Sequence, residues 1–355
     1  MRDSNSNWRK YCISPEAVIS HAMRIMDDLD CKLLIVIEDN KFKSLLSIGD
    51  IQRAIIAGAV LDSSINTILR SKVLVGRPSE RLESVKATML NFRLEFYPIV
   101  NDSKEIVDCY YWKDLFSEEP PVFNSFSCPL VIMAGGKGTR MRPLTYVVPK
   151  PLIPIGNVSL IEEIMNRFAK YGERNLFVSV NYKADIIKYH LKDSIHSKNI
   201  SYFKEQKPLG TAGSLKLIEK ELKETFIVHN CDILIDTDYS EMIDFHESNN
   251  FDLTLVAALK EVDIPYGTVE TSEGGILKAM KEKPELNFFV NSGLYVCEPI
   301  VLEYIPANEF FHITELIDKL RSNGKKVGVY PVSSGSWKDI GNWTEYLKTI
   351  NYENE

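Results

Sequence analysis

The sequence predicts an α/β protein with a mostly parallel sheet in its second half and a smaller repeated unit in its first half. Two observations predict this fold class. In the second half, short apolar runs alternate with helical patterns, which is typical of βαβ units and of a parallel sheet. In the first half, one order of helix, strand, turn and strand occurs twice, and such a repeat indicates a duplicated module.

Composition narrows the class of protein. The chain has 355 residues, of which 45% are hydrophobic and 26% are charged, as is ordinary for a globular protein of two or three domains. Its net charge of −7 argues against binding to nucleic acid or to anionic membranes. A phosphate ligand would therefore need a local cationic pocket.

The cysteines and the N-terminus suggest a cellular location. The six cysteines form no CxxC pair, so we predict free thiols in a reducing cytoplasm rather than a zinc site or a disulfide framework. Residues 1–10 are polar and lack the apolar stretch of a signal peptide. The aliphatic run at 33–37 is too short to span a bilayer. We predict a cytoplasmic protein without a membrane segment.

The first repeat occupies residues 1–66. A helix is predicted at 17–29 from the helical spacing of its apolar residues. Strands are predicted at 33–37 and 44–48, and a second helix at 51–59. The second repeat, residues 67–120, has a helix at 81–90 followed by the strands 96–100 and 106–110.

Asp50 and Asp114 occupy the same position in the two repeats. This order of elements resembles a pair of CBS domains. The resemblance implies that Ser47 and Asp50 contact the ribose of AMP, ADP or ATP, since a carboxylate can accept hydrogen bonds from both ribose hydroxyls. Tyr111 stands where the second repeat should carry Ser or Thr. Two alternatives stay open: Asp50 caps its helix, and the pair assembles a homo-oligomer.

A linker is predicted between the two halves. Two prolines and several small polar residues occur at 116–128, and we place the linker at 121–127. Residues 128–355 then form the domain with the parallel sheet.

An apolar strand predicted at 130–134 ends in a glycine-rich loop. Glycines can adopt positive φ and approach a ligand closely. Backbone N–H groups and nearby cations together suit a polyphosphate. The glycine spacing is neither the dinucleotide fingerprint nor a P-loop. The cations on or near the loop are Lys137, Arg140 and Lys150.

The run Gly-Gly-x-Gly-Thr-Arg, with Pro-Lys-Pro at 149–151, closely resembles the nucleotide-binding loop of the sugar-phosphate nucleotidylyltransferases. The resemblance implies a Rossmann-like domain of the nucleotide-diphospho-sugar transferase type. It implies that Arg140 holds the triphosphate and the departing pyrophosphate, and that Lys150 stabilises the α-phosphate. The loop residues implied to bind the nucleotide are Ala134, Gly135, Gly136, Gly138 and Thr139.

Helices predicted at 160–171 and 184–191 alternate with strands at 175–180 and 200–204. Ligands of such sheets lie at the carboxyl ends of the strands, so we expect the remaining motifs at that edge. The block after the strand at 200–204 resembles the base-reading block of the family. It implies that Glu205, Gly210 and Thr211 bind the nucleotide. Alternatively, Thr211 caps a helix at 212–220.

Two carboxylates match the metal-binding positions of the family. Asp232 ends an apolar run that begins at residue 226, and Asp339 lies in a Trp-Lys-Asp-Ile-Gly block. The resemblance implies that they hold Mg²⁺, which prefers oxygen ligands. Cys231 stands where the family has glycine. The six histidines show no paired spacing, and we interpret them as structural or surface residues.

Further matches to the family imply a pocket for a sugar 1-phosphate. In this pocket Lys283 would bind the phosphate, and the Glu282 and Asn291 side chains would bind the sugar hydroxyls. These residues are Gly267, Glu282, Lys283 and Asn291. The implied reaction is attack of a sugar 1-phosphate oxygen on the α-phosphorus of a nucleoside triphosphate, with pyrophosphate as leaving group. Such a reaction needs positioning and charge neutralisation rather than a general base.

The chain is similar to bacterial guanylyltransferases that make GDP-sugars for surface glycans, and among them to those that use glucosamine 1-phosphate in legionaminic acid synthesis. GTP and glucosamine 1-phosphate are therefore the predicted substrates. Guanine offers two N–H groups to an acceptor such as Glu205, but thymine and uracil also offer one. Thymidylyl-, uridylyl- and mannose-1-phosphate guanylyltransferases stay open as alternatives, as does a non-catalytic sensor of adenine nucleotides.

Overall fold

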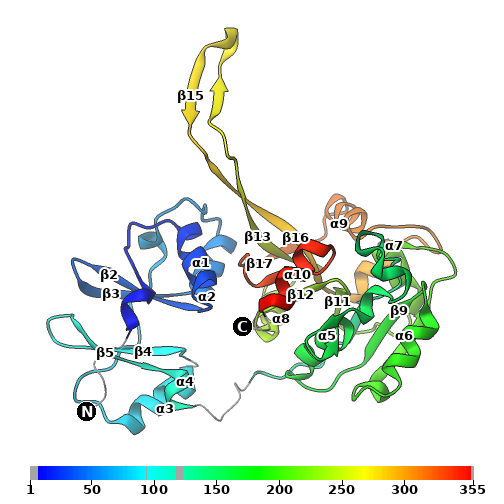
Figure 1. Cartoon of the computed structure of the whole chain (residues 1–355), viewed down its shortest axis with the longest axis horizontal. Helices are drawn as coiled ribbons and strands as arrows, with labels where there is room; N and C mark the ends of the chain where they lie inside the picture. Colours follow the sequence, from blue (N-terminus) through cyan, green and yellow to red (C-terminus); the bar gives the residue numbers. More distant parts are fainter. Residues whose placement is uncertain (1–6, 93, 117–122, 353–355) are drawn as a thin grey trace. The chain divides into compact units, whose positions relative to one another are not determined.

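The computed structural model describes residues 7–92, 94–116 and 123–352 (Figure 1). The chain forms two units. The first consists of Met1–Pro121, Leu259–Phe288 and Ser333–Gly335. The second consists of Val122–Ala258, Phe289–Val332 and Ser336–Glu355. Each unit therefore contains stretches that are far apart in the sequence.

The first repeat contains the helices and strands that its sequence predicts. A short sheet has the strand order β1 (Cys12–Ile13), β2 (Leu33–Glu38) and β3 (Lys41–Ser47). Two amphipathic helices, α1 (Ile19–Asp28) and α2 (Ile48–Ile56), turn their apolar sides into one cluster with β2 and β3. The 3₁₀ helices η1 (Asn7–Tyr11) and η2 (Ile65–Ile68) precede and follow them.

The second repeat has the same order: α3 (Leu82–Phe92), β4 (Phe96–Val100), β5 (Ile106–Tyr111) and the short α4 (Trp112–Leu115). Strands β4 and β5 pair in antiparallel fashion. The predicted order of elements is confirmed in both repeats. The assignment of these repeats as CBS domains stays a prediction, and so does the predicted division of the chain into domains.

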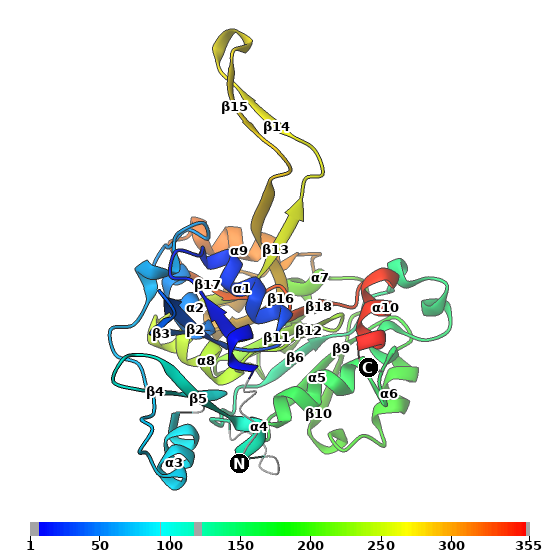
Figure 2. The same cartoon turned by 60° about the vertical axis from the view of Figure 1, so that its left-hand side comes forward.

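A hairpin from the second half of the sequence, drawn in yellow in Figure 2, is assigned to the first unit by its contacts. It consists of β14 (Thr268–Thr271) and β15 (Leu277–Lys281), with η8 (Glu273–Gly275) between them. The longer strands β13 (Leu253–Asp263) and β16 (Glu285–Cys297) lead into and out of the hairpin and contribute residues to both units. This hairpin was not predicted from the sequence.

The second unit is built on a sheet that has seven strands within the described residues, in the order β10-β9-β6-β11-β16-β13-β17. Four neighbouring strands are parallel, and β16 runs antiparallel to β11. The prediction of a mostly parallel sheet is thereby confirmed. Five strands of this sheet are β6 (Leu130–Met133), β9 (Leu176–Val180), β10 (Ile200–Lys204), β11 (Phe226–Asn230) and β17 (Val327–Val332).

Helices cover both faces of this sheet. Leu130 and Ile132 belong to one apolar cluster, whereas Val131 belongs to the other, because successive strand side chains point to opposite faces. The first cluster is completed by α5 (Leu160–Ala169), α6 (Ala184–Leu191) and α8 (Tyr239–Ser248). The second is completed by α9 (Ile313–Ser322) and by α7 (Gly210–Gly213), η7 (Ser214–Ile218) and η9 (Pro299–Tyr304).

Helix α5 illustrates why the local sequence folds as it does. Its apolar residues recur at helical spacing, and Ser159 and Glu162 form a capping box that satisfies the first backbone N–H groups. Just before the helix, β7 (Pro154–Ile155) and β8 (Val158–Ser159) form a small hairpin. The helix predicted at 160–171 ends at Ala169, close to its predicted end.

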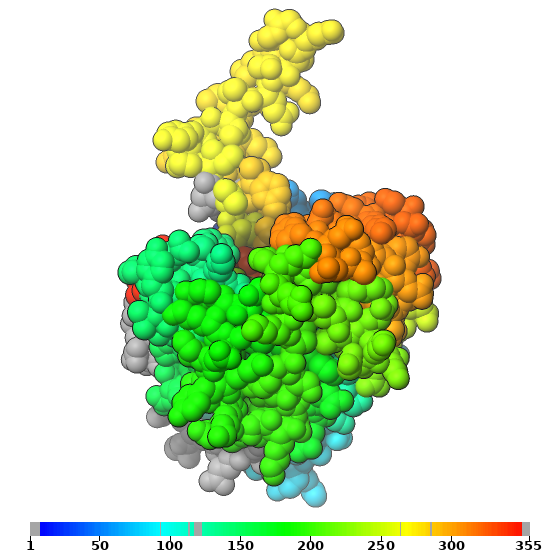
Figure 3. Space-filling view, turned by 90° about the vertical axis from the view of Figure 1, so that its right-hand side faces the viewer, coloured from blue at the N-terminus to red at the C-terminus, as the bar shows by residue number. Residues whose placement is uncertain are grey.

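One predicted helix is wrong. The structure has α7 and the 3₁₀ helix η7 where the sequence predicted a single helix at 212–220. The backbone N–H groups of Ala212 and Gly213 donate to the carbonyl of Phe311, at 3.2 and 3.0 Å, so a distant segment supplies partners at the start of this helix. Figure 3 shows the surface of this unit where the middle of the chain, in green, borders the residues around α9, in orange.

The remaining elements are short. Strands β12 (Ile233–Ile235) and β18 (Trp337–Asp339) form a two-stranded sheet, and α10 (Trp343–Tyr352) follows β18. The other 3₁₀ helices are η3 (Thr139–Met141), η4 (Leu144–Tyr146), η5 (Lys150–Leu152) and η6 (Ser197–Asn199). Within the described ranges, no helix has both the length and the apolar character needed to cross a membrane.

The predicted linker is only partly described, since residues 121 and 122 lie outside the described residues. Its next residues pack against the second unit. The rings of Phe123 and Phe126 lie 4.6 and 5.3 Å from the ring of Tyr171, and the Arg174 guanidinium lies 4.3 Å from the ring of Phe126. This part of the linker is therefore anchored to the end of α5.

Candidate active site

A cavity of about 410 Å³ opens where the parallel strands of the second unit end. Gly135 follows β6, Asn181 follows β9, Glu205 follows β10 and Asp232 follows β11, and all four residues line it. The expectation that the motifs share the carboxyl edge of the sheet is confirmed for these residues. Parallel strands bring their carboxyl ends to one edge, and this topology assembles the cavity.

The glycine-rich loop forms one wall of the cavity. Gly138 has a φ of +61°, and a Cβ there would lie 2.9 Å from Thr145 and 3.1 Å from Lys150. A Cβ on Gly135 would lie 2.8 Å from Glu205 Oε1. These two positions require glycine because the backbone is left-handed at one and packs against side chains at both. Gly136, Gly138 and Thr139 also line the cavity. Ala134, which was also predicted to bind the nucleotide, is fully buried and is not among the residues that line the cavity.

Two cations approach one carboxylate at this wall. Lys150 Nζ lies 2.6 Å from Asp232 Oδ2, and Arg140 Nη2 lies 3.7 Å from the same oxygen. The Lys150 side chain is only 8% exposed, whereas that of Arg140 is 64% exposed. Both cations lie beside the glycine loop, where they could meet the charge of a phosphate chain.

A second cavity of about 270 Å³ shares Arg140 and Asp232 with the first and is also lined by Asn291 and Asp339. The pairing of β12 with β18 sets Ile233, next to Asp232, opposite Asp339. Asp339 Oδ1 accepts a hydrogen bond of 2.7 Å from the backbone N–H of Gly341. The structure thus brings the two predicted metal ligands to one cavity.

Oxygen donors of this kind suit Mg²⁺, which takes one or two carboxylates and completes its shell with phosphate oxygens and water. The described part of the chain contains no cluster of three or more His, Cys, Asp or Glu side chains that could hold a metal by themselves. Asp232 and Asp339 therefore fit a Mg²⁺ ion that arrives with a phosphate ligand.

Glu205 lies at the other end of the glycine loop and is 7% exposed. Its Oε1 accepts a hydrogen bond of 2.6 Å from Ser179 Oγ, and its Oε2 accepts one of 3.0 Å from the backbone N–H of Leu209. Gly210 and Thr211 line the same cavity. The alternative that Thr211 caps the helix is wrong, because α7 begins at Gly210.

Cys231 fits its position despite its departure from the family glycine. It is not among the residues with positive φ, so a side chain causes no backbone strain there. Burial raises the pKa of its thiol to about 12, so the thiol stays neutral at physiological pH. Burial also lowers the pKa of the neighbouring His229 to about 4, which keeps that imidazole neutral.

Several lining residues were missed by the sequence analysis. They are Ser179, Asn181, Asn230, Phe310 and His312. Ser179 and Asn181 lie at the end of a predicted parallel strand, so their position alone could have marked them as candidates. Phe310 and His312 come from the segment before α9, and no sequence signal links them to the loop.

The predicted sugar-pocket residues fall in both units. Asn291 lines the second cavity, and its Oδ1 accepts hydrogen bonds from the Tyr295 hydroxyl at 2.9 Å and from the Gly293 N–H at 3.1 Å. The other residues lie on or beside the hairpin of the first unit, where a Cβ on Gly267 would lie 2.8 Å from Glu282. Those residues are Gly267, Glu282 and Lys283. All residues that line the two cavities belong to the second unit.

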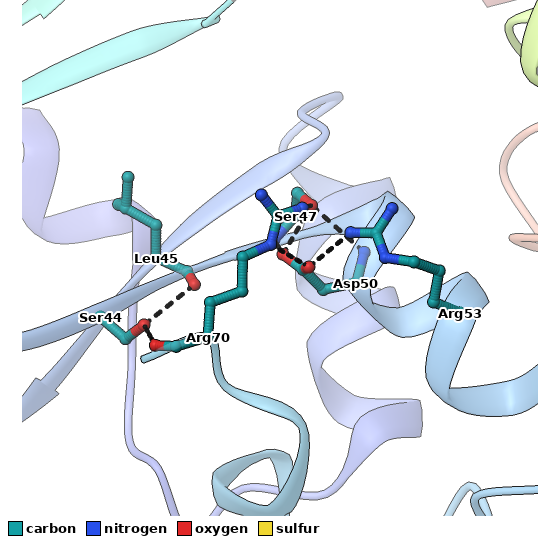
Figure 4. Close-up of polar contacts among 6 residues, drawn as sticks. All are labelled: Ser44, Leu45, Ser47, Asp50, Arg53 and Arg70. Atoms are coloured by element: carbon teal, nitrogen blue, oxygen red, sulfur yellow. Dashed lines mark hydrogen bonds and ion pairs between the residues drawn. The ribbon is translucent and has the colours of Figure 1, made fainter. Parts of the chain in front are cut away.

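Ser47 and Asp50 form a capping box at the start of α2 (Figure 4). Asp50 Oδ2 accepts hydrogen bonds from Ser47 N and Ser47 Oγ, at 3.0 and 2.7 Å. Asp50 Oδ1 accepts one of 2.6 Å from Arg53 and another from Arg70. The N-cap of α2 is therefore Ser47 and not Asp50, whose side chain contributes to the cap as the partner residue in the capping box.

Electrostatics around Asp50 favour its charged form. Burial by itself would raise the pKa of this carboxyl, but the hydrogen bonds from Ser47, Arg70 and Arg53 outweigh burial and lower it. The guanidinium-bearing side chains of Arg53 and Arg70 are 62% and 52% exposed. A ribose would have to displace an arginine from Asp50, and ribose binding stays a prediction.

The α/β/α fold and the cation-lined glycine loop are typical of the class of α/β proteins that bind phosphate groups. The family model described as "Nucleotidyl transferase" matches residues 130–355. The chain therefore belongs to the nucleotidyl transferase family.

Relatives within this family are sugar-1-phosphate guanylyltransferases. The chain is 32% identical over 227 residues to the mannose-1-phosphate guanyltransferase of Yarrowia lipolytica, covering 61% of each chain. It is 31% identical over 224 residues to the mannose-1-phosphate guanylyltransferase of Mycobacterium tuberculosis, covering 61% of this chain and 62% of that one. The match thus spans less than two thirds of these relatives' length.

Solved structures show the same fold. HddC from Yersinia pseudotuberculosis is 27% identical with a TM-score of 0.50, and the match covers 64% of this chain and 99% of that one. A second structure of HddC is complexed with GMP-PN and is 26% identical at the same TM-score and coverage. The expected resemblance to sugar-phosphate nucleotidylyltransferases is confirmed by these comparisons. They do not extend to the CBS pair or to legionaminic acid synthesis.

Proposed function

We propose that this chain transfers a guanylyl group from GTP to a sugar 1-phosphate, with release of pyrophosphate and dependence on Mg²⁺. The observation that carries the proposal is the approach of Lys150 and Arg140 to Asp232 at the wall of a glycine-lined cavity. The guanylyltransferase relatives and the GMP-PN complex of a structural neighbour support guanine as the base.

In this proposal, the two cations Arg140 and Lys150 bind different phosphate groups of the nucleotide. Arg140 is exposed and lies 3.7 Å from Asp232, so its guanidinium is available to the triphosphate and to departing pyrophosphate. Lys150 is buried beside the loop, where its ammonium can neutralise charge that develops on the α-phosphate. A sugar phosphate is ionised at neutral pH, so holding two anions in line is the main task.

Asp232 and Asp339 would hold Mg²⁺. The ion would supply charge neutralisation and a template for the phosphate oxygens. Other oxygen ligands would come from the substrate, because Mg²⁺ sites of this kind combine one or two carboxylates with phosphate.

For the acceptor, we propose glucosamine 1-phosphate from the sequence resemblance, as a step in making a GDP-sugar for a surface glycan. Mannose 1-phosphate is the second candidate, and the names of the relatives favour it. Asn291 supports a sugar site beside the second cavity. We also propose that Gly267, Glu282 and Lys283 bind the sugar 1-phosphate, as the sequence resemblance implies. We infer a cytoplasmic location, which the six free cysteines support.

The test is a pyrophosphate-release assay with purified full-length chain. It crosses GTP, UTP, dTTP, CTP and ATP with glucosamine, mannose and glucose 1-phosphates, with and without Mg²⁺. We expect turnover with GTP and one of the first two sugars, and none without the metal. Turnover with dTTP or UTP instead would replace the proposal by thymidylyl or uridylyl transfer. Silence with every pair would favour the non-catalytic sensor.

We also propose that the first unit binds AMP, ADP or ATP at Ser47 and Asp50, and that it pairs chains into a homo-oligomer. The exposed guanidinium groups of Arg53 and Arg70 support an anionic ligand there. Calorimetric titration of the full chain should detect adenine-nucleotide binding that Asp50→Ala removes. Absence of heat with all three nucleotides would leave Asp50 as a helix cap only.

A further inference from the structure

A turn from the second half of the sequence lies among the residues of the first unit. The turn is Ser333–Gly335, and the residues on either side of it belong to the second unit. It connects β17, the last strand in the order of the main sheet, to β18. Ser336 separates the turn from β18, and Asp339 is the last residue of that strand. The turn is therefore a short covalent link between the first unit and a candidate metal ligand.

One side chain of the first repeat binds this turn with both oxygens of its carboxyl group. Asp27 lies in α1, and its Oδ1 accepts a hydrogen bond of 2.6 Å from Ser333 Oγ. Its Oδ2 accepts one of 2.9 Å from the backbone N–H of Gly335. Ser333 is 4% exposed, so little water can compete for this contact. Two hydrogen bonds to one carboxyl group fix both the distance and the orientation of the turn relative to α1.

The backbone of the turn also packs closely against Asp27. A Cβ on Gly335 would lie 2.8 Å from both Cγ and Oδ1 of Asp27. Position 335 therefore has no room for a side chain while Asp27 keeps its place. Helix α1 makes a further polar contact with the second half of the sequence, because Arg24 pairs with Glu261 at 3.2 Å. The helix thus contacts the turn while a second ion pair holds the helix.

Beyond the turn, backbone hydrogen bonds connect β18 to the segment that carries Asp232. The carbonyl of Ser336 accepts a hydrogen bond of 2.8 Å from the N–H of Asp236. The N–H of Ile340 donates one of 2.8 Å to the carbonyl of Asp232. Between these two bonds, β18 pairs with β12. A displacement where the chain enters β18 would therefore move Asp339 with respect to the glycine loop, where the phosphates would bind.

We propose that Asp27 is a positioning residue for the metal site, through which the first unit holds Asp339 in place. Asp27 does not line either cavity. It fixes the turn at Ser333–Gly335, and the turn fixes the start of β18. This inference rests on the proposed function, since it requires that Asp232 and Asp339 hold Mg²⁺ together with phosphate oxygens. It assigns a role to a residue that no sequence motif marked.

The experiment measures Mn²⁺ binding to the full chain by electron paramagnetic resonance in the presence of pyrophosphate. Pyrophosphate supplies phosphate oxygens without a base or a sugar, so the result does not depend on which substrates the chain uses. The wild-type chain should bind Mn²⁺ at a site that Asp232→Asn removes. We expect Asp27→Ala to weaken binding at that site about fivefold, because the variant frees the turn that leads into β18.

Two further variants test the contact itself. Asp28→Ala is the matched control, because Asp28 is the exposed neighbour of Asp27 on α1, and it should keep the wild-type Mn²⁺ affinity. Ser333→Ala removes a donor on the side of the turn and should also weaken Mn²⁺ binding. It keeps the proposal testable if Asp27→Ala does not fold. Combining Ser333→Ala with Asp27→Ala should add little, because both act through one contact.

The Mg²⁺ dependence of turnover distinguishes positioning from a general loss of folded protein. In the pyrophosphate-release assay, Asp27→Ala should need about fivefold more Mg²⁺ for its half-maximal rate. Its kcat at saturating Mg²⁺ should approach that of the wild type. A purely structural role would lower the rate at every Mg²⁺ concentration and leave the half-maximal concentration unchanged.

The outcomes separate this inference from the proposed function. Wild-type Mn²⁺ affinity in Asp27→Ala and Ser333→Ala, with loss of binding in Asp232→Asn, would overturn the inference and leave the proposed function intact. Absence of Mn²⁺ binding in the wild-type chain would contradict the metal site of the proposed function, and this inference with it. Mn²⁺ binding that depends on Asp27, in a chain without turnover on any substrate pair, would support the inference and contradict the proposed function.

Discussion

Lys150 is placed to compete with a metal ion for Asp232. Its ammonium lies 2.6 Å from Asp232 Oδ2, and its side chain is 8% exposed. Replacing it with the uncharged methionine removes a cation from the carboxylate. We expect Lys150→Met to lower kcat by about 100-fold, because it removes charge stabilisation at the reacting phosphate. We expect the same variant to bind Mn²⁺ more tightly in the absence of nucleotide.

Electron paramagnetic resonance titration of Mn²⁺ measures the second effect without turnover. Asp232→Asn is the matched variant, since it should weaken Mn²⁺ binding and abolish turnover. Unchanged or weaker Mn²⁺ affinity in Lys150→Met would show that the ammonium does not compete for the carboxylate.

Asp50 should make the first unit sensitive to acid. Its pKa is lowered from 3.8, so the charged carboxylate stabilises the fold above that pH. This stabilisation is lost as the pH falls through the lower folded pKa. Asp50→Asn should therefore lower the melting temperature at about pH 6, and the difference from wild type should shrink as the pH falls below 3.8.

Circular dichroism melting over a pH series provides the measurement. The control is Asp102→Asn, because the Asp102 side chain is 96% exposed and its ion pair with Arg77 is at the surface. A constant difference between Asp50→Asn and wild type down to low pH would contradict the role of the charged form.

At the scale of elements, α7 depends on a close approach of two chain segments. Gly210 has a φ of +74°, and a Cβ there would lie 2.6 Å from the carbonyl oxygen of Phe311. That same oxygen accepts hydrogen bonds from Ala212 and Gly213. Gly210→Ala should therefore cost about 1–3 kcal/mol of stability. It should also raise the KM for the nucleotide, because Gly210 and Thr211 line the cavity.

Gly324→Ala is a control that separates the cost of the left-handed backbone from the cost of the close contact with Phe311. Gly324 has a φ of +72°, but a Cβ there would meet nothing within 4 Å. This control shares the left-handed backbone and lacks the close contact. Chemical denaturation and nucleotide titration of both variants give the comparison. Equal effects would assign the whole cost to the backbone and remove the Phe311 contact from the explanation.

At the scale of the whole molecule, the first unit depends on residues from the second half of the sequence. Leu259 is 1% exposed and belongs to the same apolar cluster as Ile13, Ile19 and Met23. Glu261 pairs with Arg24 at 3.2 Å. A variant that lacks residues 1–121 would keep Leu259 but lose the apolar residues that surround it in this cluster. Exposure of a leucine costs about 2 kcal/mol, so we expect the truncated chain to melt lower and to aggregate.

Leu259→Lys in the truncated chain tests whether exposure of Leu259 causes the aggregation. The substitution should recover soluble yield there, whereas in the full chain it should destabilise the first unit by placing a charge in an apolar cluster. Size-exclusion chromatography and thermal melting measure both effects. A truncated chain as soluble and stable as the full chain would show that residues 1–121 do not protect Leu259.

The sequence by itself determined the order of elements in the two repeats, the first parallel strands of the second half and the residue types of the glycine-loop site. Apolar periodicity predicted both repeats and the parallel strands, because alternation of side chains along an element is a local property. The glycine loop, Arg140, Lys150 and Asp232 could be predicted because each lies in a short motif after a strand. They meet in one cavity because parallel strands end at one edge.

The tertiary structure decided the features that depend on contacts between distant residues. Lys150 and Asp232 are 82 residues apart in sequence, and Ser179 and Glu205 are 26 apart, so no local pattern shows that these side chains meet. The start of α7 and the membership of Leu259 in the first unit likewise depend on distant partners. Local periodicity sets which face of an element is apolar, but packing determines which distant side chain completes a site.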